Sequence, residues 1–434
     1  MSPSNDTAIS AVRAREIFDS RGRPTVEAEV TLVGGAIGMA SAPSGASKGV
    51  HEAHELRDGD PQRLGGYGVR KAVAHVNQEI AGRLVGEDAT RQSHIDAALR
   101  ELDGTELLHR LGANAILATS LAVCRAAASA SGSPLYRYIA ALSGNASPSM
   151  PLPMVNILSG GAHAGRSMDV QDFLVIAHGA ADFDAALQMS LRVRSAADAI
   201  AAQRGVSRLL ADEGGLAPGF ERATEALDFM VEAIEAGGLA PGRDASIALD
   251  IAASELFDAG VYRLKRQGLG LRGEEMIELL LRWARDYPIV SIEDALHQDD
   301  WKHWNGLAAA TKLQIVGDDL FATNLARVRR GIEAGAANAV LIKPNQNGTL
   351  SGTIEVLNEA RRAGLATIVS ARSGETEDSF IADLAVGTGS GQIKIGSVRT
   401  SERFSKYNRL LQIGEDASLA FAAPLRPFRP EVPG

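Results

Sequence analysis

The chain has 434 residues, of which 45% are hydrophobic and 22% charged, and its formal net charge is −9. A chain of this length suits a large domain plus a smaller one, and it buries enough surface to need no disulfide or structural metal. The acidic balance excludes a typical nucleic-acid binder, which needs clustered lysine and arginine. The single cysteine, Cys124, cannot form an internal disulfide and lies in a run of small residues. We therefore expect a core cysteine in a protein of the reducing cytoplasm.

Neither a secretion signal nor a membrane segment is expected. The N-terminus, residues 1–7, carries Asp6 and has no basic or apolar stretch. The most apolar stretch, residues 115–124, is too short to span a bilayer and is followed by Arg125. The proline-rich end, residues 424–434, is expected to be irregular.

The first third of the chain combines strands and helices. Residues 8–33 predict strands, because residues 25–30 alternate between apolar and polar side chains. A stretch rich in Ser, Gly and Pro at 41–47 predicts a mobile loop. Apolar residues that recur every three or four positions predict a helix at 69–84, and small residues predict a closely packed helix at 113–130.

The stretch 143–153 contains a glycine and three prolines and is the best domain boundary. We predict an N-terminal α+β capping domain with a mobile active-site loop at 1–140, and a C-terminal barrel domain with the catalytic and metal residues at 141–434. Beyond the boundary, short apolar runs alternate with helical stretches such as 185–202 and 274–285. This alternation predicts parallel strands with helical crossovers. The fold class is therefore α/β, with a TIM-like (β/α)8 barrel.

Six successive apolar runs of this second part each lead to an ionisable residue. In chain order these residues are Asp250, Glu293, Asp318, Lys343, Arg372 and Lys394. Because the carboxyl ends of the strands in such a barrel converge on one face, we expect the six side chains to meet there. Any one acid alone is better explained as a helix cap, but an ordered series of six argues against that explanation.

The order of these charges indicates a chemistry. Three converging carboxylates repel each other unless a cation lies between them, and a hard divalent ion such as Mg²⁺ fits oxygen ligands. The lysines and the arginine suit an anionic substrate, and Arg372 matches the geometry of a phosphate. A lysine flanked by other cations, as in this series, has a lowered pKa and can act as a base near neutral pH.

Two further stretches hold candidate residues. Glu213 precedes a pair of glycines and lies between apolar residues, so a raised pKa would suit a general acid, although a simple turn acid is the alternative. His163 lies in a glycine-rich segment, and Gln171 follows it. Both could orient a substrate, while a purely structural histidine remains equally open.

Several motifs together resemble the enolase family over residues 10–415. They are Arg15–Glu27, Pro43–Ser47, Asp212–Gly215, Ser291–Asp294, Gly317–Leu320, Ser373–Asp378 and Gly391–Lys394. The resemblance implies a small α+β domain followed by an eight-stranded barrel with an irregular start, assembled as homodimers or homo-octamers. It also implies reversible dehydration of 2-phosphoglycerate, a small phosphorylated carboxylate, to phosphoenolpyruvate. Enolase-superfamily sites use a lysine or histidine base with one or two Mg²⁺ ions.

The resemblance also implies a role for each matching residue. Lys343 takes the C2 proton, and Glu213 helps the C3 hydroxyl to leave. The remaining roles are Asp250, Glu293 and Asp318 as ligands of Mg²⁺, Ser47 as a ligand of a second Mg²⁺, Lys394 on the substrate carboxylate, Arg372 and Ser373 on the phosphate, and His163, Gln171 and Asp172 along the site.

Five positions depart from the family pattern. Asp172 stands where enolases have a glutamate, and Ala371 stands where they have a histidine. Lys48 replaces a threonine, Ser159 replaces an asparagine, and Asn347 replaces an aliphatic residue. Asp172 and Ala371 fall on the side of the leaving group. They therefore put the substrate in question more than the enolisation step.

Three functions follow as hypotheses. The first is a working enolase, and the second is a paralogue of altered specificity such as a carboxyphosphonoenolpyruvate synthase. The third is a non-catalytic binding role, since bacterial enolases also appear secreted or at the cell surface and bind plasminogen through terminal lysines. The chain ends in Glu431–Gly434 without a lysine, and its complete acid and lysine set argues against a purely structural role.

Overall fold

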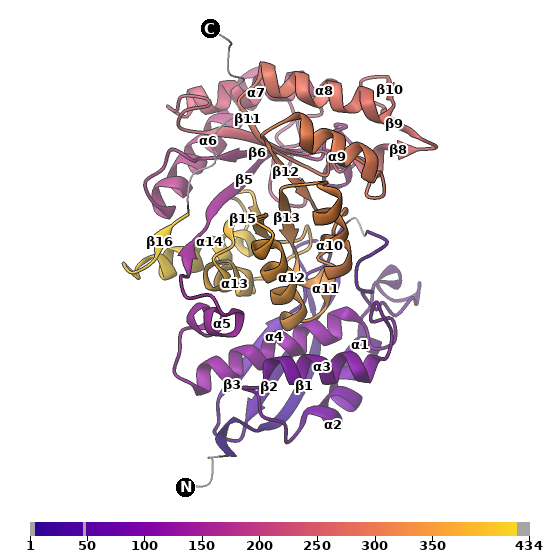
Figure 1. Ribbon diagram of the computed structural model, residues 1–434, viewed down its shortest axis with the longest axis vertical. Helices are drawn as coiled ribbons and strands as arrows, with labels where there is room; N and C mark the ends of the chain where they lie inside the picture. The colour runs from indigo at the N-terminus through magenta and orange to yellow at the C-terminus, as the bar shows by residue number, and fades with distance from the viewer. Residues whose placement is uncertain (1–4, 47–48, 423–434) are drawn as a thin grey trace.

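The computed structural model describes residues 5–46 and 49–422 (Figure 1). The predicted site residue Ser47, its neighbour Lys48 and the proline-rich end lie outside the described residues. The N-terminal strands and helices occupy one end of the molecule, and the barrel occupies the other (Figure 1).

The N-terminal part is an antiparallel sheet covered by helices. Its strands are β1 (Ile9–Phe18), β2 (Pro24–Leu32) and β3 (Ile37–Ser41), in that order. The helical elements are η1 (Asn5–Thr7), η2 (Leu64–Gly66), α1 (Arg70–His75), the π-helical turn η3 (Val76–Ile80), α2 (Ala81–Leu84), α3 (Gln92–Asp103), α4 (Ala113–Ala130) and α5 (Leu135–Ser143). The predicted strands at 8–33 and the helices at 69–84 and 113–130 are confirmed.

Helix α4 packs directly on β2 and β3, because both surfaces carry small residues. A Cβ atom added at Gly38 of β3 would lie 2.1 Å from the carbonyl oxygen of Ala122, so only glycine allows this approach. Among the helices of the described residues, only α4 is long and apolar enough to cross a bilayer. Of its length 83% is buried within the protein, as expected for a core helix, and it holds the buried Cys124.

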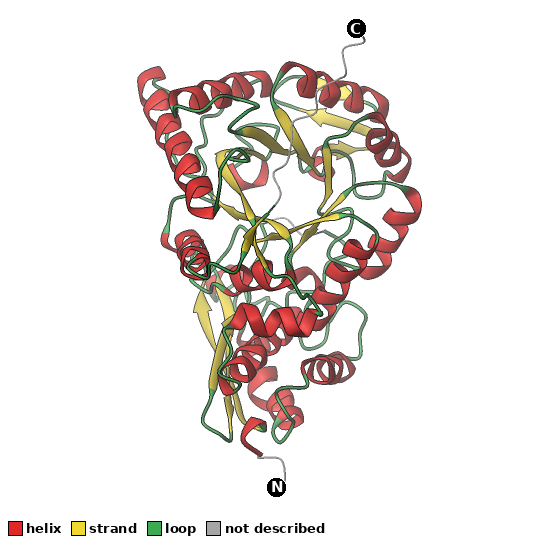
Figure 2. Cartoon of the chain, turned by 60° about the vertical axis from the view of Figure 1, so that its left-hand side comes forward, coloured by secondary structure: helices red, strands yellow, loops and turns green. Residues whose placement is uncertain are grey.

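The C-terminal part is a closed barrel of eight strands, which confirms the predicted fold class. The strands are β5 (Leu152–Ser159), β6 (Asp172–Ile176), β7 (Ser246–Asp250), β11 (Ile289–Glu293), β12 (Gln314–Gly317), β13 (Ala339–Ile342), β14 (Ala366–Ser370) and β15 (Gly391–Gly396). Helices surround this barrel (Figure 2). They are α6 (Phe183–Arg204), α7 (Ala223–Ala236), α8 (Gly273–Asp286), α9 (Trp301–Ala310), α10 (Leu325–Ala334), α11 (Pro344–Asn347), α12 (Leu350–Arg362), α13 (Phe380–Thr388) and α14 (Ser401–Gly414).

One barrel strand corrects the expectation of parallel strands throughout. Strand β6 runs antiparallel to both β5 and β7, whereas the other neighbouring pairs are parallel. The connection from β5 to β6 contains only the short 3-10 turn η4 (Gly161–Ala164), and two helices, α6 and α7, separate β6 from β7. A single crossover helix brings the chain back to the end of the barrel where the preceding strand began, so the next strand is parallel to it. A pair of helices brings the chain back to the end where the preceding strand finished, so β7 runs antiparallel to β6.

The smaller strands lie outside the barrel. They are β8 (Phe257–Asp258), β9 (Val261–Leu264) and β10 (Leu269–Leu271), which form a sheet next to η5 (Ala253–Leu256), and the pair β4 (Ser149–Met150) and β16 (Ala420–Phe421).

Apolar side chains fill the barrel interior below its polar rim. These buried residues are Leu152, Met154, Leu174, Ile176, Ala248, Val290, Val316, Ala339, Leu341 and Ile368. A packed interior leaves only the carboxyl-terminal face of the strands open to chemistry.

Candidate active site

The six ionisable residues at the strand ends meet at one mouth of the barrel. Asp250 ends β7 and Glu293 ends β11, while Asp318 and Lys343 directly follow β12 and β13. Arg372 lies two residues beyond β14, and Lys394 lies within β15. We call Asp250, Glu293 and Asp318 the acid cluster.

Lys394 joins two members of the acid cluster. Its Nζ lies 2.9 Å from Asp250 Oδ2 and 2.8 Å from each carboxylate oxygen of Glu293. Burial disfavours the ammonium, but the charges of Asp250 and Glu293 outweigh it and raise the pKa of Lys394 well above its usual value. Lys394 is therefore a fixed cation.

Lys343 is hydrogen-bonded to the third acid, Asp318, whose other oxygen accepts from Gln346 Nε2 at 2.8 Å. The prediction of a lowered pKa for Lys343 is wrong in this arrangement. Burial and Arg372 act in the predicted direction, but the charge of Asp318 outweighs them and raises the pKa of Lys343. The sequence pattern includes Asp318 and the flanking cations, but it does not show that Asp318 lies in direct contact with Lys343.

The acid cluster retains negative charge that the lysines do not balance. Burial and the charges of Asp250 and Asp318 raise the pKa of Glu293 well above its usual value, even with Lys394 beside it. Buried carboxylates that crowd each other in this way fit a hard divalent cation with oxygen ligands, such as Mg²⁺.

A second group of carboxylates lies next to the acid cluster, formed by Asp294, Asp318 and Asp319, which are close enough to share an ion. Asp294 is already engaged, because its two oxygens accept the backbone N–H groups of Asp318 and Asp319, each at 2.9 Å. Asp294 therefore positions the acidic strand end, and its backbone adopts φ 43°. The sequence analysis assigned it no role.

Arg372 faces a carboxylate that the sequence analysis missed. Its Nη1 donates to Glu52 Oε2 at 2.9 Å and to Asn345 Oδ1 at 3.0 Å. The neighbouring Ser373 Oγ accepts from Arg21 Nη1 at 3.1 Å. An arginine that binds a carboxylate in this way also matches the oxygens of a phosphate.

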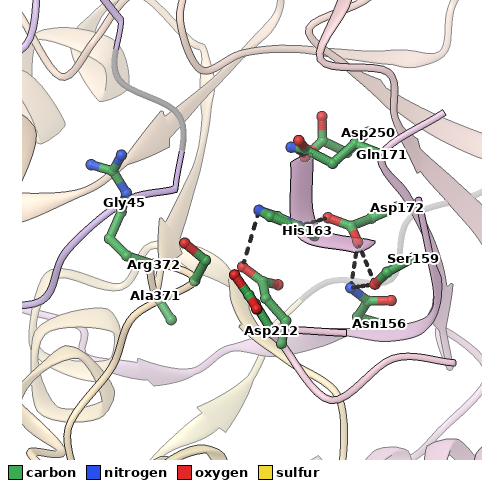
Figure 3. Close-up of polar contacts among 12 residues, drawn as sticks. Gly45, Asn156, Ser159, His163, Gln171, Asp172, Asp212, Asp250, Ala371 and Arg372 are labelled. Atoms are coloured by element: carbon green, nitrogen blue, oxygen red, sulfur yellow. Dashed lines mark hydrogen bonds and ion pairs between the residues drawn. The ribbon is translucent and has the colours of Figure 1, made fainter. Parts of the chain in front are cut away.

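His163 and Asp172 lie across the site from Arg372 (Figure 3). Together with Glu213 they form a second set of residues, which we call the histidine cluster. His163 Nδ1 lies 2.9 Å from Asp172 Oδ2, and its Nε2 lies 3.9 Å from Glu213 Oε1. Burial disfavours the imidazolium, but the charges of Asp172 and Glu213 raise the pKa of His163 to about 9. His163 is therefore a cation between two acids near neutral pH.

Asp172 is held by residues of its neighbouring strand. Its Oδ1 accepts from Asn156 Nδ2 at 2.6 Å and from Ser159 Oγ at 2.8 Å (Figure 3). Ser159 is the cross-strand partner of Asp172, and the strand is irregular between Asn156 and Leu158. These donors and His163 fix the shorter carboxylate. Asn156 was missed, although a polar residue between apolar neighbours in a buried strand was a signal.

The prediction of a raised pKa for Glu213 is also wrong. Burial acts in that direction, but the charges of His163 and Arg403, followed by those of Lys394 and Lys343, lower the pKa of Glu213. The apolar neighbours in the sequence do not reveal these cations. Glu213 would therefore have to gain a proton during a reaction to act as an acid.

The remaining predicted residues divide between the site and its surroundings. Gln171 Nε2 donates to Asp250 Oδ2 at 3.2 Å, so it borders the acid cluster. Ala371 is buried and lies beside Arg372, across the site from Asp172 (Figure 3). Asn347 instead accepts from Arg100 Nη2 at 2.6 Å, which links it to α3.

Family comparisons agree with this architecture. The family described as the enolase N-terminal domain matches residues 9–139, and the enolase C-terminal TIM barrel domain matches residues 147–423. Together they cover nearly the whole chain, so the protein belongs to the enolase family. This membership, together with the acidic site, supports a magnesium-dependent enzyme of the lyase type that binds small phosphorylated substrates.

Proposed function

We propose that the protein catalyses the reversible dehydration of 2-phosphoglycerate to phosphoenolpyruvate. The observation that carries this proposal is the meeting of three acids, two of them buried, with two lysines and an arginine at one barrel mouth. They are Asp250, Glu293, Asp318, Lys343, Lys394 and Arg372.

The charges suit the two anionic ends of this substrate. Lys394 is a permanent cation that would pair with the carboxylate, and Arg372 with Ser373 would hold the phosphate in place of Glu52. Held by Asp250, Glu293 and Asp318, Mg²⁺ would neutralise the negative charge that develops on the substrate carboxylate.

Lys343 would remove the proton from C2. Its amine must first lose its own proton, and the contact with Asp318 opposes this loss. If Asp318 turns its charge toward another ligand, Arg372 and Lys394 remain as neighbouring cations and favour the neutral amine. The neutral amine of Lys343 would then lie next to C2, because Lys394 holds the carboxylate attached to this carbon.

The histidine cluster would assist departure of the C3 hydroxyl as water. Glu213 would deliver a proton that it first receives from the imidazolium of His163, whose Nε2 lies 3.9 Å away, and His163 would be left neutral. Asp172 is bound by Asn156 and Ser159 and would orient His163.

A second candidate is favoured by the same cluster. Ala371 offers no polar group, and Asp172 is shorter than the family glutamate and held by its own strand. These features suit an enzyme that makes a related enolpyruvate, such as carboxyphosphonoenolpyruvate, with the same proton abstraction and different contacts near the leaving group.

An ultraviolet absorbance assay with purified protein, 2-phosphoglycerate and Mg²⁺ tests the proposal. Formation of phosphoenolpyruvate at a rate typical of metabolic enzymes, on the order of 1–10³ s⁻¹, supports the first function. Binding of 2-phosphoglycerate without turnover supports the second. A protein that neither binds nor converts 2-phosphoglycerate would contradict both functions.

We also infer the domain bounds, the cellular location and the assembly of the chain from its membership of the enolase family. We propose a capping domain at 1–140, a barrel domain at 141–434, and a cytoplasmic homodimer or homo-octamer. Light scattering of the purified protein measures the assembly, and a monomer at micromolar concentration contradicts it.

A further inference from the structure

A second pocket lies beside the active site, on the outer side of the same loops. Its cavity has a volume of about 260 Å³ and is bordered by Gly161 and Gln171 near the histidine cluster and by Ile251, which follows Asp250. Four cationic residues line it: Arg166, Arg263, Lys265 and Arg266.

The acids around this pocket are already engaged. Glu255 pairs with Arg166 at 3.0 Å, and Asp258 pairs with Arg263 at 3.0 Å. Asp169 accepts the backbone N–H groups of Arg266 at 3.0 Å and Gln267 at 3.1 Å. Counted against these three acids, the four cations leave one net positive charge on the pocket, and neither Lys265 nor Arg266 has an acid bound to its side chain.

Lys265 and Arg266 provide this unbalanced charge. Within residues 5–46 and 49–422, no carboxylate lies within ion-pair distance of either side chain. The Arg266 guanidinium makes one long contact, from Nη2 to the carbonyl oxygen of Gly219 at 3.4 Å. Two neighbouring cations on one pocket attract an anion, and more strongly at low ionic strength.

The floor of the pocket is buried and ordered. Met168 and Ile251 supply an apolar surface, and Gln171 lines the floor with an amide whose nitrogen is bound to Asp250. Within the described part of the chain, the amide oxygen of Gln171 is buried without a hydrogen-bond partner. A cationic rim over a partly apolar floor of this volume fits a small organic acid rather than a macromolecule.

We propose that this pocket binds a small phosphorylated or carboxylated molecule, as an anion site separate from the substrate site at Lys394 and Arg372. Lys265 and Arg266 hold its charge, and the floor contacts its carbon skeleton. The site does not depend on which reaction the enzyme catalyses.

Equilibrium dialysis with radiolabelled inorganic phosphate at low ionic strength tests the site. The double variant Lys265→Ala/Arg266→Ala is expected to bind one phosphate fewer per chain than the wild type. Both side chains are exposed, so the fold is expected to remain, which a thermal melt checks. The matched control is Lys312→Ala/Arg285→Ala, which removes the same charge from exposed residues before β12 and β11, at the opposite end of the barrel.

An unchanged phosphate stoichiometry in the double variant, or an equal loss in the control, overturns the proposal. Saturating 2-phosphoglycerate with Mg²⁺ separates the two sources of the anion. If the phosphate in the pocket is retained, the pocket is a separate site. If 2-phosphoglycerate displaces it, the pocket is part of the substrate site and the proposal is overturned. Because dialysis needs no turnover, this result is independent of the proposed reaction.

Discussion

The acid cluster and the histidine cluster hold their carboxylates in different ways. In the acid cluster, Lys394 and Lys343 bind carboxylates from three neighbouring strands. In the histidine cluster, Asp172 is bound by neutral donors of its own sheet and by a single imidazole. The first arrangement is tied together by ion pairs between strands, whereas the second depends on local hydrogen bonds.

This difference separates two parts of the chemistry. Residues that would bind a metal and remove a proton match the family pattern, whereas both Asp172 and Ala371 depart from it near the place where the hydroxyl would leave. Enolisation and release of the leaving group can therefore be tested with different variants.

The largest expected effect comes from Lys343→Ala. Loss of a general base typically costs about 10²–10⁴-fold in rate, and we expect the upper part of this range because Lys343 is the proposed proton acceptor. Turnover of 2-phosphoglycerate measures the effect. The exposed Lys312→Ala is the control and should retain its rate. Near wild-type turnover by Lys343→Ala would exclude it as the base.

The next largest expected effect is a loss of stability from a buried arginine behind the site. Arg403 is fully buried on α14 and donates to the carbonyl oxygens of Arg372 and Ser373, each at 2.7 Å, and to that of Ile395 at 3.1 Å. Arg403→Met removes three hydrogen bonds to buried carbonyl oxygens, of which that of Ser373 keeps only the donor Ser20 Oγ at 3.3 Å, so we expect about 3 kcal/mol less stability. Chemical denaturation measures the loss. A difference below about 0.5 kcal/mol would show that these hydrogen bonds do not stabilise the fold.

The smallest expected effect is a change in one pKa. His163 has a pKa of about 9 because Asp172 and Glu213 outweigh burial, so it loses its proton only as the pH rises through that value. Asp172→Asn removes the nearest negative charge, and the pKa of His163 should fall toward the usual value of about 6.5. NMR titration of the imidazole measures it. An unchanged pKa would assign the charged state of His163 to Glu213 alone.

The same pKa gives a sign to the pH dependence of stability. Because the folded-state pKa of His163 is raised, its contribution is fully present below about pH 6.5 and is lost as the pH rises through about 9. Unfolding free energies of wild type and His163→Gln should therefore differ most below pH 6.5 and converge above pH 9. A constant difference over this range would contradict the assignment.

Much of the fold and site could be predicted from the sequence. The strand-end rule brought six ionisable residues together because barrel topology fixes where parallel strands end. The resemblance implied an irregular start of the barrel, but the residues of β6 do not show its antiparallel direction, since the apolar run at 173–176 has the same pattern in either direction.

Other features depended on distances that no local pattern contains. The pKa of Lys343 is set by its contact with Asp318 and that of Glu213 by His163. The strand-end rule brings Lys343 and Asp318 to one barrel mouth but gives no distance between them. Glu52 reaches Arg372 from the N-terminal part of the chain, which no periodicity could reveal.

Binding of Mg²⁺ to the acid cluster tests the central claim most directly. Titration calorimetry of the wild type and of Glu293→Gln, which removes one charge at nearly constant shape, compares the two affinities. We predict binding to the wild type and an affinity at least about tenfold weaker in the variant, equivalent to about 1.4 kcal/mol. Equal affinities, or no binding by the wild type, would contradict a metal site formed by Asp250, Glu293 and Asp318.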